Sequence, residues 1–299
     1  MSASYASVPI TLPPPGRSIW RKRLNKAGFA ALVILVCAVT FFPLYWMIIT
    51  TVQPTRYTLT YPPSFIPEVI NFTSFRDLFG EEPIERWILN SIYLSSVVTV
   101  ICVSLAVIGG YALSALRWKG KGLFAIFLLM TQMLPEALII VPIFRIYVNF
   151  PIINQDIRGS LPAVALVDAA FILPICVWVM KNMFDTVPKE VQEAAVVDGA
   201  SQIRVLFQIV LPITLPGLVA VGVVAFFYAW NEFLFAQVLI QSRDSFPASV
   251  GLASMITMLD TPIQRLLAAG MIFAIPPVVF YILMQRYIVA GIASGAVKG

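Results

Sequence analysis

Six unbroken apolar runs, each long enough to cross a lipid bilayer, constrain this chain more than any other feature of its sequence. A helix needs about 20 apolar residues to cross the hydrocarbon core. A backbone surrounded by lipid must satisfy its own hydrogen bonds, so runs of this length are expected to be helices. The predicted fold is all-α, a polytopic membrane protein with six transmembrane helices, at residues 29–50, 88–113, 123–147, 161–180, 213–240 and 266–288.

Composition supports a membrane protein over a soluble one. Only 12% of the residues are charged and 59% are hydrophobic, whereas an ordinary soluble domain carries about 25% charged residues. The net charge of +5 would suggest nucleic acid as a partner in a soluble protein. Here the basic residues lie mostly in short loops and tails, so membrane orientation explains them better and no nucleic-acid partner is expected.

The distribution of Lys and Arg predicts the orientation. Thirteen of the 20 basic residues fall on one side of the predicted spans and seven on the other. The richer side is expected to be cytoplasmic, so both termini are predicted to be cytoplasmic. This divides the chain into an N-terminal tail (1–28), a transmembrane domain (29–290) and a C-terminal tail (291–299).

The sequence lacks the residues that several kinds of chemistry require. The chain has no histidine, and Cys37, Cys102 and Cys176 fall in three different spans without paired spacing. We interpret the cysteines as packing residues and expect neither a disulfide nor a metal site. No GxxxxGK[ST] loop is present: Gly120-Lys121-Gly122 lacks both the leading Gly and the following Ser or Thr. We therefore expect no cofactor on this chain, and no ATPase site.

Prolines recur inside the predicted spans and are expected to kink them, because proline removes a backbone hydrogen bond. They are Pro135, Pro142, Pro174, Pro216, Pro276 and Pro277. Each kink would either provide a point at which the helix flexes or simply shape a static helix bundle.

The cytoplasmic connection at residues 184–212 carries the most informative pattern. Pro188 suits the first turn of a helix, Gly199 can adopt the left-handed conformation that ends one, and Ser201 can cap the next. A single face of the first helix is formed by Val191, Ala194, Ala195 and Asp198. The apolar face of the second helix holds Val205, Leu206 and Ile209.

The prediction is two short helices joined at a glycine, lying across the cytoplasmic face. Small alanine side chains would let the first helix sit closely in a groove of another protein, and Glu193 offers a charge that an Arg could hold. A helix seated in a groove moves with it, so this contact would transmit motion. The alternative is a loop that merely rests on the membrane surface.

This connection resembles the EAA motif of ABC importer permeases. The matching residues are Glu193, Ala194, Ala195, Asp198, Gly199, Ala200, Phe207, Ile209, Leu211, Pro212 and Pro216. In that family the loop forms coupling helices that dock into a cleft of the cytoplasmic ATPase subunit. The resemblance implies that Glu193, Ala194, Ala195, Asp198, Gly199 and Ala200 couple this chain to an ATPase.

The whole chain is similar to the MalG-type permeases of carbohydrate uptake, which share the six spans and the position of the loop. Trp230-Asn231-Glu232-Phe233 and the tail 295–299 also resemble that subgroup. The resemblance implies a bacterial inner-membrane subunit that forms half of a sugar pathway and is not itself an enzyme. It implies a second homologous permease, an external substrate-binding protein, and two cytoplasmic ATPase subunits that hold ATP and Mg.

The substrate path is predicted from residue type. A neutral sugar favours neutral polar groups and aromatic faces, which in and near the spans gives Thr131, Gln132, Tyr228 and Asn231; Glu136 is added as an intramembrane carboxylate. Carboxylates are costly in a bilayer and are functional candidates by default. Glu136 is either functional or paired with a neighbouring helix, and we interpret Asp168 and Glu232 as structural or cavity-lining residues.

Two other functions stay open. One is an ABC permease for a non-sugar polar solute such as a polyol phosphate. The other is a secondary transporter driven by an ion gradient, which needs titratable groups along its path. Glu136 and Asp168 would serve that role, but the EAA loop would then have no purpose.

Overall fold

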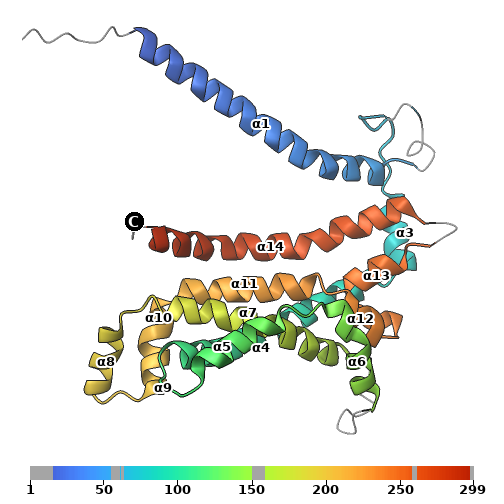
Figure 1. Ribbon diagram of the computed structural model, residues 1–299. Coiled ribbons are helices and arrows are strands. Elements are labelled where there is room, and N and C mark those ends of the chain that lie inside the picture. Colours follow the sequence, from blue (N-terminus) through green and yellow to red (C-terminus); the bar gives the residue numbers. More distant parts are fainter. Residues whose placement is uncertain (1–15, 55–60, 62–63, 150–158, 258–260, 297–299) are drawn as a thin grey trace, which may run out of the picture. The chain divides into compact units, whose positions relative to one another are not determined.

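The computed structural model describes residues 16–54, 61, 64–149, 159–257 and 261–296. Within these residues the regular secondary structure is helical and includes no strand (Figure 1). The chain forms two compact units, residues 1–70 and 71–299. Most of the predicted N-terminal tail and the last three residues of the predicted C-terminal tail lie outside the described residues.

The first unit is built on one long helix, α1 (Gly16–Val52), which includes the whole first predicted span. The segment that follows folds back on the end of this helix. The hydroxyl of Tyr45 donates to the carbonyl oxygen of Phe65, with the two oxygens 2.5 Å apart. The ring of Trp46 contacts the Phe65 ring edge-on. The apolar side chains of α1 remain largely exposed within its own unit, as expected of a helix that faces lipid or another protein.

Three long helices of the second unit confirm predicted spans. They are α4 (Ile84–Ser114), α7 (Leu161–Phe184) and α14 (Ile263–Ala296), and each is long and apolar enough to cross a membrane. With α11 (Leu215–Trp230) they form the packed centre of this unit (Figure 1). On α11 and α14, Phe226 stacks on Phe280 with 3.9 Å between ring centroids, and Trp230 stacks on Phe273 at 5.0 Å.

The core lies between α4 and α7, and each helix contributes one face repeated every four residues. On α4 this buried face holds Leu94, Val98, Cys102 and Ala106. On α7 it holds Val164, Asp168, Ile172, Cys176, Met180 and Phe184. Cys102 and Cys176 thus pack in the core, as predicted, whereas Cys37 is exposed on α1. Small residues on these faces allow a close crossing, which is the main source of helix association in lipid.

The third predicted span is present as a bent pair of helices and not as one continuous helix. It forms α5 (Lys121–Thr131) and α6 (Glu136–Asn149), which meet at an angle of 97°. Pro135 separates them: it has no N–H to donate and it disfavours the helical conformation of Leu134. The proline that was predicted to kink this span therefore breaks it.

The fifth predicted span also breaks, at its outer end. After α11 the chain leaves the helix at Asn231 and starts again as α12 (Leu234–Leu239). The carboxylate of Glu232 accepts hydrogen bonds from the N–H groups of Phe235, at 2.5 Å, and Ala236, at 3.1 Å, and so caps α12. At the inner end the chain bends by 82° near Thr214, and Pro216 lies in the first turn of α11 and does not kink it.

The second half of the long external loop is ordered by contacts within the second unit. It contains α3 (Thr73–Glu81), which packs on α14. Glu81 pairs with Arg265, and Glu82 pairs with Arg243 in the short 3₁₀-helix η2 (Arg243–Ser245). The next helix, α13 (Ala248–Ser254), packs on α4. These carboxylates are thus held by the chain itself.

The crossing of α4 and α7 predicts a sharp difference between two helical glycines. A Cβ at Gly110 would lie 2.8 Å from Met180 Cβ and 2.9 Å from the backbone nitrogen of Lys181, whereas a Cβ at Gly222 would have its nearest neighbours at 3.8 Å. Gly110→Ala is expected to destabilise the protein by about 1–3 kcal/mol through overpacking. Gly222→Ala is expected to be neutral or to gain up to ~1 kcal/mol from helix propensity. Thermal unfolding in detergent measures both, and equal midpoints would contradict the close crossing.

Candidate functional site

The predicted coupling segment forms a helix, α8 (Lys189–Val197), at the end of the second unit where α5 begins and α7 ends (Figure 1). Pro188 lies just before the helix, one position earlier than a first-turn residue. Its fixed φ and missing N–H suit this start.

Gly199 ends α8 as predicted. Its φ is +84°, in the left-handed region that only glycine adopts without strain. The N–H of Ala200 donates to the carbonyl of Ala195 and the N–H of Gly199 to that of Val196, each at 3.0 Å. This pair of bonds is a Schellman motif, which satisfies carbonyl groups at the helix end and fixes the direction of the exiting chain. The turn after α8 is therefore defined and not a loose loop.

The second predicted helix is also present, but as a composite. It runs through α9 (Gln202–Val205), the π-helical turn η1 (Leu206–Val210) and α10 (Leu211–Ile213). Ser201 caps its start, with its Oγ accepting from the N–H of Arg204 at 3.3 Å. Val205 and Leu206 are buried in the core of the second unit, so this helix is anchored to the spans.

The outer surface of α8 is open within this chain. Val191 is 41% exposed, and Ala194 and Asp198 on the same face are exposed as well. Ala195 and Ala200 face inward and pack against the core. The predicted single face is thus divided, because its alanines at 194 and 195 point in different directions. Glu193 is exposed and forms no ion pair with the described part of the chain.

Of the predicted path residues, the structure joins Glu136 and Tyr228 directly. The hydroxyl of Tyr228 on α11 donates to Oε1 of Glu136 at the start of α6, with the oxygens 2.5 Å apart. This bond connects the broken third span to the fifth. Gln132, in the break itself, donates from Nε2 to the carbonyl of Phe171 on α7 at 2.8 Å. Three predicted spans therefore meet around the break.

The remaining two path candidates do not join this group through hydrogen bonds. The hydroxyl of Thr131 donates to the Leu128 carbonyl at 2.6 Å, and the amide of Asn231 donates to the Phe227 carbonyl at 2.7 Å. Both bonds are made within the residue's own helix. Thr131 and Asn231 are consequently weaker candidates on geometry than Glu136, Tyr228 and Gln132.

Asp168 occupies an unusual position in the core. It is fully buried on the packed face of α7, and neither of its carboxyl oxygens accepts a hydrogen bond from a described residue. Glu232 has a structural role as the cap of α12, as predicted, and the hydroxyl of Ser249 also donates to its backbone carbonyl.

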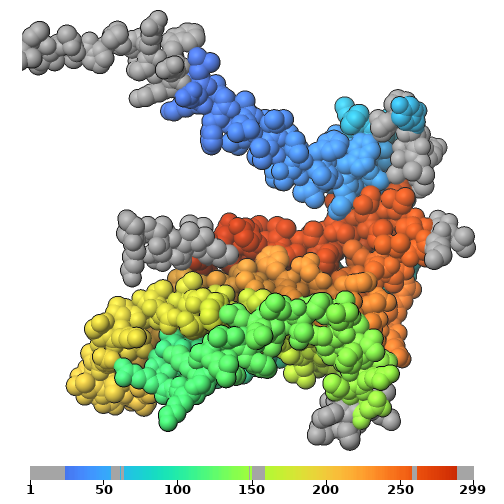
Figure 2. Space-filling view, viewed as in Figure 1, coloured from blue at the N-terminus to red at the C-terminus, as the bar shows by residue number. Residues whose placement is uncertain are grey.

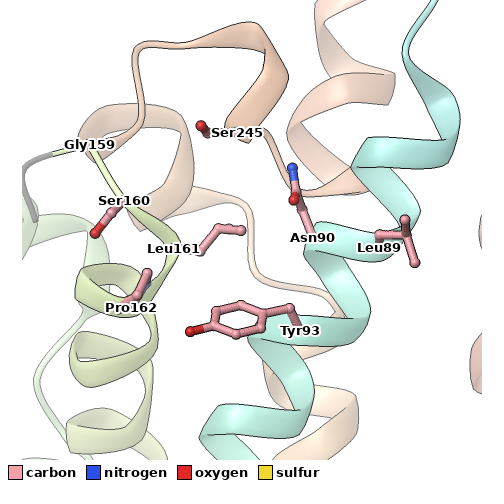
Figure 3. Close-up of a pocket in the computed structure, with 8 residues that line it drawn as sticks. All are labelled: Leu89, Asn90, Tyr93, Gly159, Ser160, Leu161, Pro162 and Ser245. Atoms are coloured by element: carbon pink, nitrogen blue, oxygen red, sulfur yellow. The ribbon is translucent and has the colours of Figure 1, made fainter. Parts of the chain in front are cut away.

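A separate pocket lies at the opposite end of the second unit from α8. It has a volume of about 560 Å³ and lies between the starts of α4 and α7 and η2 (Figure 3). In this view the ring of Tyr93 points toward the start of α7, Leu161 points into the pocket, and Ser245 lies above them. The amide of Asn90 on α4 links this helix to η2 and the residue after it, because it donates to the carbonyls of Asp244 and Phe246, each at 2.9 Å. No predicted path residue lines this pocket.

Comparison with protein families identifies the chain. Residues 102–294 match the family described as binding-protein-dependent transport system inner membrane component. The chain belongs to this family. The matched region runs from the middle of α4 to the end of α14 and includes α8 and its Schellman turn. The protein is accordingly a multi-pass inner-membrane protein, and its predicted membership of the ABC importer permeases is confirmed.

Individual relatives extend the match to nearly the whole chain. The inner membrane ABC transporter permease protein YcjP of Escherichia coli (strain K12) is 31% identical, over 93% of this chain and 99% of the relative. The trehalose/maltose transport system permease protein MalG of Thermococcus litoralis is 30% identical, over 89% of this chain and 94% of the relative.

A solved structure confirms the fold. A chain of a bacterial ABC transporter involved in the import of the acidic polysaccharide alginate superposes with a TM-score of 0.75. The match covers 92% of this chain and 99% of that chain, at 19% sequence identity.

The hydrogen bond between Tyr228 and Glu136 predicts energetic coupling between the broken span and α11. A double-mutant cycle of Tyr228→Phe and Glu136→Gln is expected to show an interaction of about 1 kcal/mol or more in thermal unfolding. Thr131→Val combined with Tyr228→Phe is the control, because Thr131 bonds within its own helix. Additive effects in the first cycle would contradict the contact.

Proposed function

We propose that this chain forms half of the translocation pathway of an ATP-driven importer for a sugar, and that α8 couples it to a separate ATPase. The observation that carries the proposal is the exposed helix α8, ended by the left-handed Gly199 and anchored through α9 and η1. This segment also carries the EAA residues. The remaining partners are a second homologous permease, an external binding protein and a second ATPase subunit.

The geometry of α8 suits it to pass on a rigid-body movement. It follows the end of α7 after a short turn, and the composite helix after it leads into α11. A partner that seats α8 in a groove would therefore act on two spans at once. Because the Schellman turn fixes the exit direction of the chain, displacement of α8 carries α9 with it.

A neutral sugar fits the path residues better than a phosphorylated solute. Glu136, Tyr228 and Gln132 present a carboxylate, a phenol and an amide, and none of the five path residues is basic. Carboxylates accept hydrogen bonds from sugar hydroxyls but repel a phosphate group. The MalG relative, whose name refers to trehalose and maltose, supports the same substrate class. The second candidate is import of a polyol phosphate or another polar solute.

The intramembrane carboxyl of Asp168 is the observation that favours an ion-gradient transporter instead. The two mechanisms differ in energy source and subunits, so one experiment separates them. The tagged chain is pulled down from detergent-solubilised native membranes, bound proteins are identified, and ATP hydrolysis is measured across a panel of sugars and sugar phosphates.

The expected result is recovery of an ATPase and a second permease, with hydrolysis stimulated by one sugar and its binding protein. Stimulation by a phosphorylated solute alone would replace the sugar with that class. A chain that purifies alone and moves solute with an ion gradient would overturn the ATP-driven mechanism.

The turn at Gly199 gives a test of coupling by α8. Gly199→Pro is expected to leave the chain inserted but to abolish substrate-stimulated ATP hydrolysis, because proline fixes φ near −65° and this turn needs +84°. Gly199→Asn is the matched control, since asparagine tolerates the left-handed conformation. It should keep most of the stimulation. Full stimulation in the proline variant would contradict the role of α8.

A further inference from the structure

Apart from Ala195, which packs against the core, α8 does not lie close against the spans. A groove of about 960 Å³ separates it from the turn between α4 and α5 and from the end of α7. Figure 2 shows this turn and the segment from α8 to α9 at the same end of the second unit. One wall of the groove is the side of α8 that carries Gln192, Glu193, Val196 and Val197.

The groove combines basic and apolar side chains. Its basic residues are Arg117, Lys121, Lys181 and Lys189, and its acidic residues are Asp185 and Glu193. Its apolar residues include Leu113, Leu116, Phe184, Val187, Val196 and Val197. A ligand that fills it must therefore present both negative charge and apolar surface.

Two of the basic residues are already engaged. The ammonium of Lys121 donates to the Ser114 carbonyl at 2.8 Å and to the Leu116 carbonyl at 3.3 Å, which caps the end of α4. Lys181 pairs with Asp185 at 2.5 Å. Burial disfavours the charged form of Asp185, but hydrogen bonds from Lys181 and Ser114 prevail and hold its pKa below the usual value. Asp185 therefore stays ionised at neutral pH and offsets Lys181.

The other two basic residues, Arg117 and Lys189, have no such partner in the described part of the chain. Both are exposed, and neither forms a hydrogen bond or ion pair with another residue that the structure describes. They approach the groove from two different elements, the α4–α5 turn and the first residue of α8. Glu193 is the one remaining acidic group among the lining residues, so the unengaged lining charge is positive.

The position of the groove at the ends of two spans points to the kind of ligand. It lies where α4 and α7 end, on the side that the Lys and Arg distribution assigns to the cytoplasm. Trp118 lies beside Arg117 in sequence, and the ring of Trp178 lies 5.2 Å beneath the ammonium of Lys181. Tryptophan is enriched at the level of lipid headgroups. Basic pockets between transmembrane helices on the cytoplasmic side suit anionic headgroups.

We propose that this groove binds an anionic phospholipid of the cytoplasmic leaflet. Arg117 and Lys189 hold the headgroup phosphate from opposite walls, and Leu116 and Val197 contact the apolar part of the lipid. The bound lipid fills the space between α8 and the spans. This inference does not rest on the proposed function, because lipid binding requires neither substrate nor ATP hydrolysis.

A photoactivatable phosphatidylglycerol tests the site directly. The transporter, purified with the subunits that accompany this chain, is placed in phosphatidylcholine discs with the probe lipid, irradiated and mapped by mass spectrometry. Cross-links are expected in peptides 113–121 and 181–197. The double variant Arg117→Gln/Lys189→Gln should label about fivefold less for each charge removed.

Lys119→Gln is the matched control, because Lys119 lies in the same turn but does not line the groove. It should label like the parent, and the charge-preserving variant Arg117→Lys/Lys189→Arg should restore labelling. Thermal midpoints of all variants report whether the fold is kept. Excess unlabelled phosphatidylglycerol should compete, and inorganic phosphate should not.

Three outcomes would overturn the proposal. Equal loss in Lys119→Gln would mean general surface attraction and no site. Cross-links confined to other parts of the chain would place the lipid elsewhere. Competition by inorganic phosphate as strong as that by phosphatidylglycerol would assign the groove to a free phosphate ligand instead of a lipid.

Discussion

The close crossing of α4 and α7 is the contact on which the rest of the second unit depends. Gly110 lets the backbone of α7 approach α4, and the buried faces of both helices then meet along their length. In lipid there is little hydrophobic gain from bringing helices together, so such tight packing must supply the association energy. α11 packs on both helices, and α8 follows the end of α7 after a short turn. A shift at this crossing would therefore also displace α11 and α8.

The parts of the fold that follow from local chemistry could be predicted from the sequence. Apolar runs of bilayer length indicated the spans of α1, α4, α7 and α14. The end of α8 at Gly199 and the cap at Ser201 also followed, because only certain residues fit those backbone positions. The division into two short helices across a glycine is therefore a consequence of local residue chemistry alone.

The breaks in the third and fifth spans could not be predicted in the same way. Hydropathy averages over a window, so the run from 123 to 147 looks continuous; Pro135 predicts a kink in this run but not a bend of 97°. At Glu232 the decisive fact is a side chain turned back onto the N–H groups of α12, which depends on tertiary context. The pair of Tyr228 and Glu136 joins residues 92 positions apart, and no local pattern indicates it. The same holds for the groove beside α8, whose basic residues come from separate segments.

The bend between α5 and α6 has a consequence for where water must reach. A bilayer core offers no partner to the N–H and C=O groups that a broken helix releases, so lipid cannot surround a bend of 97°. Such backbone persists only against protein or beside water. Two apolar side chains at this bend, Met133 at 79% exposed and Leu134 at 56%, are not covered by the described part of the chain. The membrane-embedded surface of this protein is thus of two kinds: helical walls that lipid can contact, and breaks such as the bend between α5 and α6, which only a hydrated cavity or another polypeptide can cover.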